Sequence, residues 1–172
     1  NMVILKNQNE LFLINPIRLN KEEENKLKAL GNIKAIYRLG DFHGLDDQYY
    51  IDTFACEFFC QEGQTTYPKQ KADHFITSKS KAPIKNAEFF IFSKALFPEA
   101  ALFLRDQKLL ITTDSIQNWT DWSFTTLPAK ILLFCMGFKT KLLIGKPWLK
   151  TTKIRLTATA IKYTAAINEP VY

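Results

Sequence analysis

Residues 33–50 read IKAIYRLGDFHGLDDQYY, and this stretch decides which fold the sequence predicts. Its first five residues are apolar and partly β-branched, apart from one lysine, which predicts a buried strand over 33–37. The thirteen residues that follow contain one histidine, three aspartates and two glycines. Because open α/β sheets usually bind ligands just beyond the carboxyl ends of their strands, we expect the functional site in residues 38–50.

The residues before this strand predict a hairpin and a helix. Two short apolar runs, 2–5 and 11–14, surround a polar turn, which is typical of a β-hairpin. Asn20 is a suitable helix N-cap, and the three glutamates at 22–24 favour the positive end of the helix dipole. Gly31 predicts the end of that helix. The chain therefore opens with the predicted order strand, strand, helix, strand.

Beyond the loop, the sequence predicts further strands and a second long helix. Residues 115–126, which carry Trp119 and Trp122, predict a loop, and residues 151–172 have only weak helical periodicity. Asp106-Gln107 predicts a tight hairpin turn. The predicted elements are a helical turn at 49–54, strands at 57–60, 88–92, 100–105 and 108–112, and a buried helix at 128–138 that begins with proline.

The composition is that of an ordinary globular protein. The chain has 172 residues, of which 47% are hydrophobic and 23% charged, so one domain over 1–172 can bury a core. No uncharged apolar run approaches the roughly 20 residues of a membrane-spanning helix, and the start of the chain resembles no export signal. These features predict a cytoplasmic protein that does not contact the membrane.

The three cysteines are Cys56, Cys60 and Cys135, an odd number. The C-x3-C spacing of the first two is a weak metal signal by itself. Free Cys is among the most buried residue types, and a reducing cytoplasm keeps thiols unpaired. We therefore expect three buried free thiols and no disulfide.

Positive charge gathers in the last third of the chain, within a net charge of +6. Such a surface attracts anionic partners, but it is equally typical of a solvated cationic face. The lysines are not interleaved with aromatic residues in a recognised motif, so nucleic acid is not the partner we predict. The basic residues after position 129 are Lys130, Lys139, Lys141, Lys146, Lys150, Lys153, Arg155 and Lys162, against the single acid Glu169.

The order of the predicted elements and the HGLDDQ segment at 43–48 resemble the metallo-β-lactamase superfamily, whose first metal motif is H-x-H-x-D-H on a loop after a strand. The wider context of this segment, and KLLITTDSIQNW at 108–119, is similar to a small metallohydrolase-like subgroup. The resemblance implies an α+β fold built as a four-layer αββα sandwich. It covers about 11–148, so the C-terminus is predicted to be divergent or shortened.

The resemblance also implies a ligand set. His43 takes the first histidine position of the motif, Asp47 its aspartate, and Asp114 the metal-bridging aspartate at a strand end, so these three are the candidate metal ligands. Asp47 is also the catalytic candidate. Leu45 and Gln48 stand where the family has histidines, and no histidine follows His74. The usual dinuclear site cannot be built from these residues, and we predict no resident cofactor, with one divalent ion (zinc, manganese or iron) as the alternative.

A structural reading of the same residues stays open. His43 could hold the loop by bonding to backbone carbonyls or to Asp47, Asp47 could cap the helical turn at 49–54, and Asp114 could cap the segment after its strand. Residues near these positions are predicted to line a pocket for a small-molecule ligand. The predicted pocket residues are Asp46, Gln48, Tyr49 and Trp119.

Three functions follow from these observations. The first is a binding protein on a degenerate metallo-β-lactamase fold, of unknown substrate and without the dinuclear metal site. The second is a mononuclear metal-dependent hydrolase of an ester, thioester or phosphodiester. The third is a polyanion or nucleic-acid binding module. Self-association is compatible with each of them, and whether the chain is an enzyme stays undecided by the residues alone.

Overall fold

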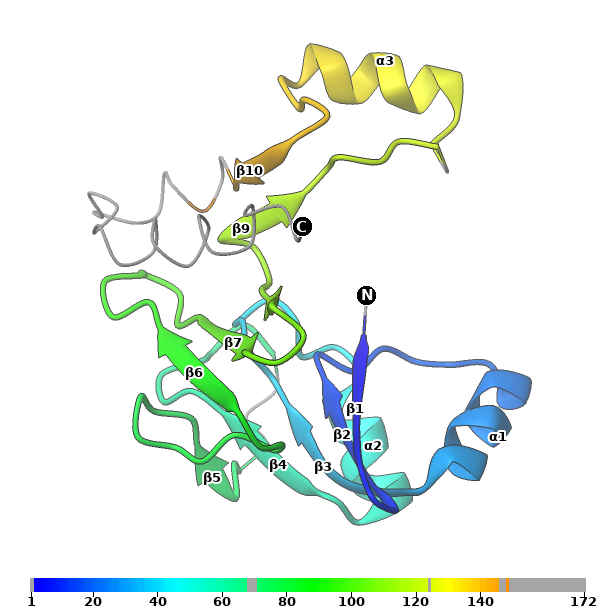
Figure 1. The fold of residues 1–172 in the computed structure, drawn as a ribbon, viewed down its shortest axis with the longest axis vertical. Helices are drawn as coiled ribbons and strands as arrows, with labels where there is room; N and C mark the ends of the chain where they lie inside the picture. The colour runs from blue at the N-terminus through cyan, green and yellow to red at the C-terminus, as the bar shows by residue number, and fades with distance from the viewer. Residues whose placement is uncertain (1, 68–70, 124, 146–147, 149–172) are drawn as a thin grey trace.

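The structure is a computed structural model that describes residues 2–67, 71–123, 125–145 and 148 (Figure 1). Helices and strands are mixed along the chain, and the strands form separate sheets, which confirms the α+β class. No helix in the described ranges is long and apolar enough to cross a membrane. The predictions for residues 151–172 lie outside the described residues.

The larger sheet has five strands in the order β1-β2-β3-β4-β5. β1 and β2 form the predicted antiparallel hairpin, and each later pairing is parallel. Parallel neighbours need crossover connections, and helices supply two of the three, α1 between β2 and β3 and α2 between β3 and β4. The elements are β1 (Val3–Asn7), β2 (Glu10–Ile14), α1 (Lys21–Leu30), β3 (Asn32–Tyr37), α2 (Asp47–Phe54), β4 (Glu57–Cys60) and β5 (His74–Phe75).

The start of α1 confirms the prediction from sequence. The Asn20 side chain accepts a hydrogen bond of 2.9 Å from the Glu23 backbone N–H, and the Glu23 carboxylate accepts one of 3.4 Å from the Asn20 backbone N–H. This reciprocal arrangement is a capping box, which satisfies donors that the first turn leaves unpaired. Leu27 then points inward and is buried.

The smaller sheet is antiparallel, with the order β6-β7-β8. Its strands are β6 (Ala87–Ile91), β7 (Ala100–Leu104) and β8 (Leu109–Ile111), within one or two residues of the predicted ranges. All five residues of β7 are buried, as expected for the central strand of a sheet covered on both sides.

Side chains alternate across β2 and thereby define the layers. Phe12 and Ile14 pack with Leu102 and Ile111 of the smaller sheet, whereas Leu11 and Leu13 pack with residues of α1 and α2. Successive side chains of a strand point to opposite faces, so the same strand contributes to two cores. The described residues therefore form three layers: helices, the five-stranded sheet and the three-stranded sheet.

The last described elements are β9 (Ile116–Asn118), α3 (Leu127–Cys135) and β10 (Leu142–Ile144). β9 and β10 form an antiparallel pair, so the loop predicted at 115–126 in fact begins with a strand. Figure 1 shows this pair and α3 extending away from the two larger sheets. No residue of α3 is buried, so the predicted burial of this helix is wrong among the described residues. Apolar composition alone does not specify which partner a helix meets.

The cysteines divide into two environments. Cys56 and Cys60 are buried as predicted, and burial raises the pKa of Cys56 to about 11 and that of Cys60 above its usual range. Cys135 is exposed, which corrects the prediction that all three are buried, because α3 does not pack against the sheets. All three are free thiols. The raised pKa values disfavour the thiolate form that metals require.

Candidate functional site

The loop after β3 connects the two sheets. The Arg38 backbone N–H still donates to the Phe59 carbonyl of β4, at 2.8 Å. One residue later, the Leu39 carbonyl accepts a bond of 2.8 Å from Ala100 at the start of β7. Gly40 then forms an isolated antiparallel bridge with Glu99. The chain therefore crosses from one sheet to the other at the position where the sequence predicted the site.

Gly40 allows this crossing to be tight. A Cβ atom at this position would lie 2.5 Å from the Thr113 hydroxyl oxygen, which real Cβ atoms essentially never do. The close approach brings the loop beside the segment after β8. His43 Nε2 consequently lies 3.5 Å from Asp114 Oδ2, with both side chains partly exposed. The structure thus brings together two of the three predicted metal ligands.

Asp47, the third predicted ligand, is fully buried in an ion pair with Arg38. The Arg38 Nε donates to Asp47 Oδ2 at 2.6 Å, and the two side chains are 4% and 0% exposed. Burial raises the pKa of Asp47 to about 6, against the opposing effect of Arg38. A Cβ atom at Gly44 would overlap the Arg38 guanidinium, so the second glycine of the loop makes room for the pair.

The proposed capping role of Asp47 is corrected by its position. Asp47 is the first residue of α2, and Asp46 occupies the N-cap, without a side-chain capping hydrogen bond. Asp46 instead accepts a bond of 2.8 Å from the Arg18 backbone N–H. The start of α2 is therefore held by tertiary contacts.

The described residues do not fit a dinuclear metal centre. They contain no group of three His, Cys, Asp or Glu side chains placed to hold one ion. His43 and Asp114 approach each other, but the Arg38 guanidinium already neutralises Asp47 with a positive charge. A metal ion at Asp47 would have to lie beside that buried cation or displace it, and displacement would leave the guanidinium without a partner.

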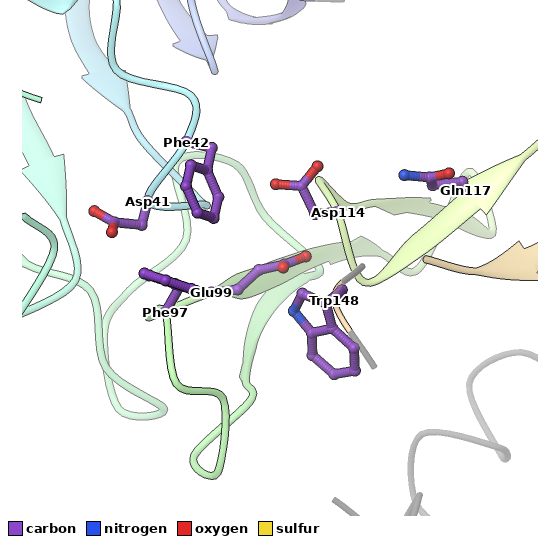
Figure 2. Close-up of a pocket in the computed structure, with 7 residues that line it drawn as sticks. All are labelled: Asp41, Phe42, Phe97, Glu99, Asp114, Gln117 and Trp148. Carbon is purple, nitrogen blue, oxygen red and sulfur yellow. The ribbon is translucent and has the colours of Figure 1, made fainter. Parts of the chain in front are cut away.

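A cavity of about 220 Å³ opens beside the His43–Asp114 pair. Figure 2 shows its wall, in which the Glu99 carboxylate lies between Phe97 and Trp148, and the Asp114 carboxylate faces Phe42. Most ligand sites are concave and largely apolar, with a few polar groups that orient the ligand, and this wall has that character. The lining residues are Asp41, Phe42, Phe97, Glu99, Asp114, Gln117 and Trp148.

Two of the lining acids are buried, with different partners. Asp41 accepts hydrogen bonds from the backbone N–H groups of Thr65 and Thr66 and from the Thr66 hydroxyl, and its carboxylate turns away from Phe42 (Figure 2). Glu99 Oε1 accepts from the Ser115 N–H at 3.0 Å and from the Ser115 hydroxyl at 2.5 Å. Burial, aided by the nearby charge of Asp114, raises the pKa of Glu99.

The predicted pocket residues Asp46, Gln48, Tyr49 and Trp119 do not line this cavity. Gln48 donates to Asp52 at 2.6 Å, the Tyr49 hydroxyl donates to Glu24, and Trp119 Nε1 donates to Gln117 at 3.0 Å. Trp119 thereby contacts a residue of the wall without being part of it.

Sequence reasoning missed most of the wall. Phe42 lies inside the loop at 38–50 without a local pattern that marks it, and the acid at 99 directly precedes an apolar strand, AALFL. An acid immediately before a strand expected to be buried was the available signal. The lining residues that were not expected at the site are Phe42, Phe97, Glu99, Gln117 and Trp148.

No protein-family model matches this chain, and no curated protein is significantly similar to it. Its function is therefore argued from the loop and the cavity.

Proposed function

We propose that this chain is a small-molecule-binding protein on a metallo-β-lactamase-like fold that has lost the dinuclear metal centre. The Arg38–Asp47 ion pair is the observation that carries the proposal. It gives the aspartate of the motif-like segment a permanent cation from the protein itself. The cavity at Asp114 has the concave shape and mixed wall of a ligand site.

The αββα sandwich belongs to this proposal. Its support is the order of layers in the described residues, with α1 and α2 on one face of the larger sheet and β6–β8 on the other. The outer face of the smaller sheet is apolar as well, where Phe92 packs edge-on against Trp148 with ring centroids 5.2 Å apart. An apolar outer face is suited to a fourth layer.

Elemental analysis of protein purified without chelator tests the loss of the metal centre. We expect well under one transition-metal ion per chain, because the aspartate is already paired. Two tightly held ions per chain would overturn the proposal. Fragment screening by thermal shift tests ligand binding on the same preparation, since any ligand selective for the folded state raises the melting temperature.

A mononuclear metal-dependent hydrolase is the second candidate, favoured by the 3.5 Å approach of His43 and Asp114. One imidazole and one carboxylate leave open positions for a zinc, manganese or iron ion and its water. Turnover of ester, thioester and phosphodiester substrates with each metal checks it, with His43→Ala and Asp114→Ala expected to abolish activity. Metal-independent turnover, or none at all, would discard this candidate.

A further inference from the structure

The cavity wall is acidic, although the chain as a whole is basic. Three of the seven described lining residues carry carboxyl groups and none is lysine or arginine, in a protein of net charge +6. We propose that the cavity binds a small organic cation, with its ammonium group between Glu99 and Asp114 and its apolar part against Phe42, Phe97 and Trp148. This inference rests on the proposed function, that the cavity is a ligand site.

Glu99 supplies the first half of the cation site. The residue is 3% exposed, and it accepts hydrogen bonds from the Ser115 N–H and hydroxyl, which are uncharged donors. Among the described residues, no lysine or arginine forms an ion pair with Glu99. Burying a carboxylate without a cation is unfavourable, so an ammonium group bound beside Glu99 would stabilise its charged form.

Asp114 supplies the second half. Its carboxylate faces Phe42 across the cavity (Figure 2) and lies 3.5 Å from His43 Nε2, a separation that leaves its oxygens available to another donor. An ammonium group placed between Asp114 and Glu99 would donate a charge-assisted hydrogen bond to each. Such bonds are about twice as strong as those between neutral groups.

The aromatic wall selects the same sign of charge. Phe42 and Phe97 contact each other with ring centroids 4.8 Å apart, and Phe92 holds Trp148 in place from the outer face of the smaller sheet. The faces of aromatic rings carry partial negative charge and attract cations. The acidic and the aromatic residues of the wall therefore both favour an ammonium ion over a neutral molecule of the same shape, and both disfavour an anion.

A matched series of ligands tests this selection on the full chain. The probes are 2-phenylethylammonium, 2-phenylethanol and phenylacetate, which share a phenyl ring and differ in charge. Calorimetric titration at pH 7 measures each affinity. We expect the ammonium compound to bind about tenfold or more tighter than the alcohol, as one or two charge-assisted hydrogen bonds imply, and phenylacetate to bind more weakly than the alcohol.

Charge-neutralising variants locate the site. Asp114→Asn and Glu99→Gln keep the shape of each side chain, and each is expected to weaken the ammonium compound about tenfold while leaving 2-phenylethanol within about twofold. Glu10→Gln removes one exposed charge from the β1–β2 hairpin and is the control, with no change expected. If Glu99→Gln does not fold, Asp114→Asn still tests the position of the ammonium group, because the Asp114 side chain is partly exposed and its replacement is compatible with folding.

The outcomes separate the two proposals. Equal or tighter binding of the alcohol or of phenylacetate, abolished by Phe42→Ala, would refute the cation preference and keep the cavity as a ligand site. Binding of the ammonium compound that Glu10→Gln weakens as much as Asp114→Asn would refute the placement between Asp114 and Glu99. Failure of all three compounds to bind would overturn both the cation inference and the ligand site.

Discussion

At the scale of single residues, the Arg38–Asp47 pair decides what the loop can do. Both side chains are almost wholly inaccessible, and among the described residues Arg38 Nη2 and Asp47 Oδ1 have no hydrogen-bond partner. A buried pair that is not fully hydrogen-bonded contributes little net stability, but removing one member leaves an uncompensated charge. The pair therefore makes the loop sensitive to changes at either position.

Replacing one member of this pair should be worse than replacing both. We expect Arg38→Met to lower the free energy of unfolding at pH 7 by about 3–5 kcal/mol, because Asp47 must then stay charged without a cation or bind a proton. The double variant Arg38→Met with Asp47→Leu should lose much less. Urea denaturation of the three proteins measures this difference, and a double variant that is the least stable would contradict the assignment.

Asp47 should also make stability depend on pH. Its pKa is raised to about 6 in the folded protein, so the folded state binds a proton that the unfolded state releases near pH 4. The stability that protonated Asp47 contributes is therefore present below pH 4 and is lost as the pH rises through 6. Relative to Asp47→Asn, the free energy of unfolding should fall by roughly 2–3 kcal/mol from pH 4 to 7.

Chemical denaturation at several pH values checks this dependence. The comparison with Asp47→Asn cancels the contributions of the other titratable groups, except those that interact with Asp47. The raised pKa of Glu99 also lowers the free energy of unfolding as the pH rises, but it does so in the wild type and in Asp47→Asn alike. If the difference in free energy of unfolding between the wild type and Asp47→Asn is constant from pH 4 to 7, or grows in favour of the wild type as the pH rises, Asp47 is ionised throughout.

At the scale of elements, α1 is specified locally by its capping box. Asn20→Ala removes the acceptor of the Glu23 N–H and should lower the free energy of unfolding by about 1 kcal/mol. Asn20→Asp keeps an acceptor at the N-cap and is the matched control, with stability close to that of the wild type. Equal losses in both variants would mean that Asn20 acts through something other than capping.

The helix α3 is similar in length to α1 but has no buried residue. Ile131 and Phe134 are 58% and 70% exposed, so Ile131→Ser and Phe134→Ser should each change the free energy of unfolding by no more than about 0.5 kcal/mol. Denaturation in dilute solution measures this. A loss several times larger would show that α3 is covered, by another part of the chain or by a second molecule.

At the scale of the whole molecule, Gly145, directly after β10, packs against the segment that carries Asp114. The Gly145 N–H donates to the Ser115 carbonyl at 3.0 Å, and a Cβ atom at this position would overlap the Asp114 carbonyl oxygen. Gly145→Ala should therefore displace the segment that carries Asp114 and cost about 1–3 kcal/mol of stability. The same variant should bind cavity ligands more weakly, while its circular dichroism spectrum stays unchanged. Unaltered affinity would show that the segment carrying Asp114 tolerates the shift.

The sequence by itself determined the elements whose signals are local. Short apolar runs next to polar turns predicted the first hairpin and the strands β6–β8, and an N-cap with acids behind it predicted α1. The loop after β3 was also placed correctly, because its glycines, histidine and aspartates directly follow the apolar run of that strand. These features depend on neighbours a few residues apart, which a sequence displays directly.

Only the tertiary structure decided which side chains meet. Asp47 faces Arg38 instead of His43 and Asp114, Glu99 reaches the loop after β3 from the other sheet, and α3 lies exposed although its composition suits a core. The physical reason is that charge pairing and burial depend on what the fold brings within a few ångströms. Residues tens of positions apart, such as Phe42 and Trp148, share one cavity wall for reasons that no local pattern contains.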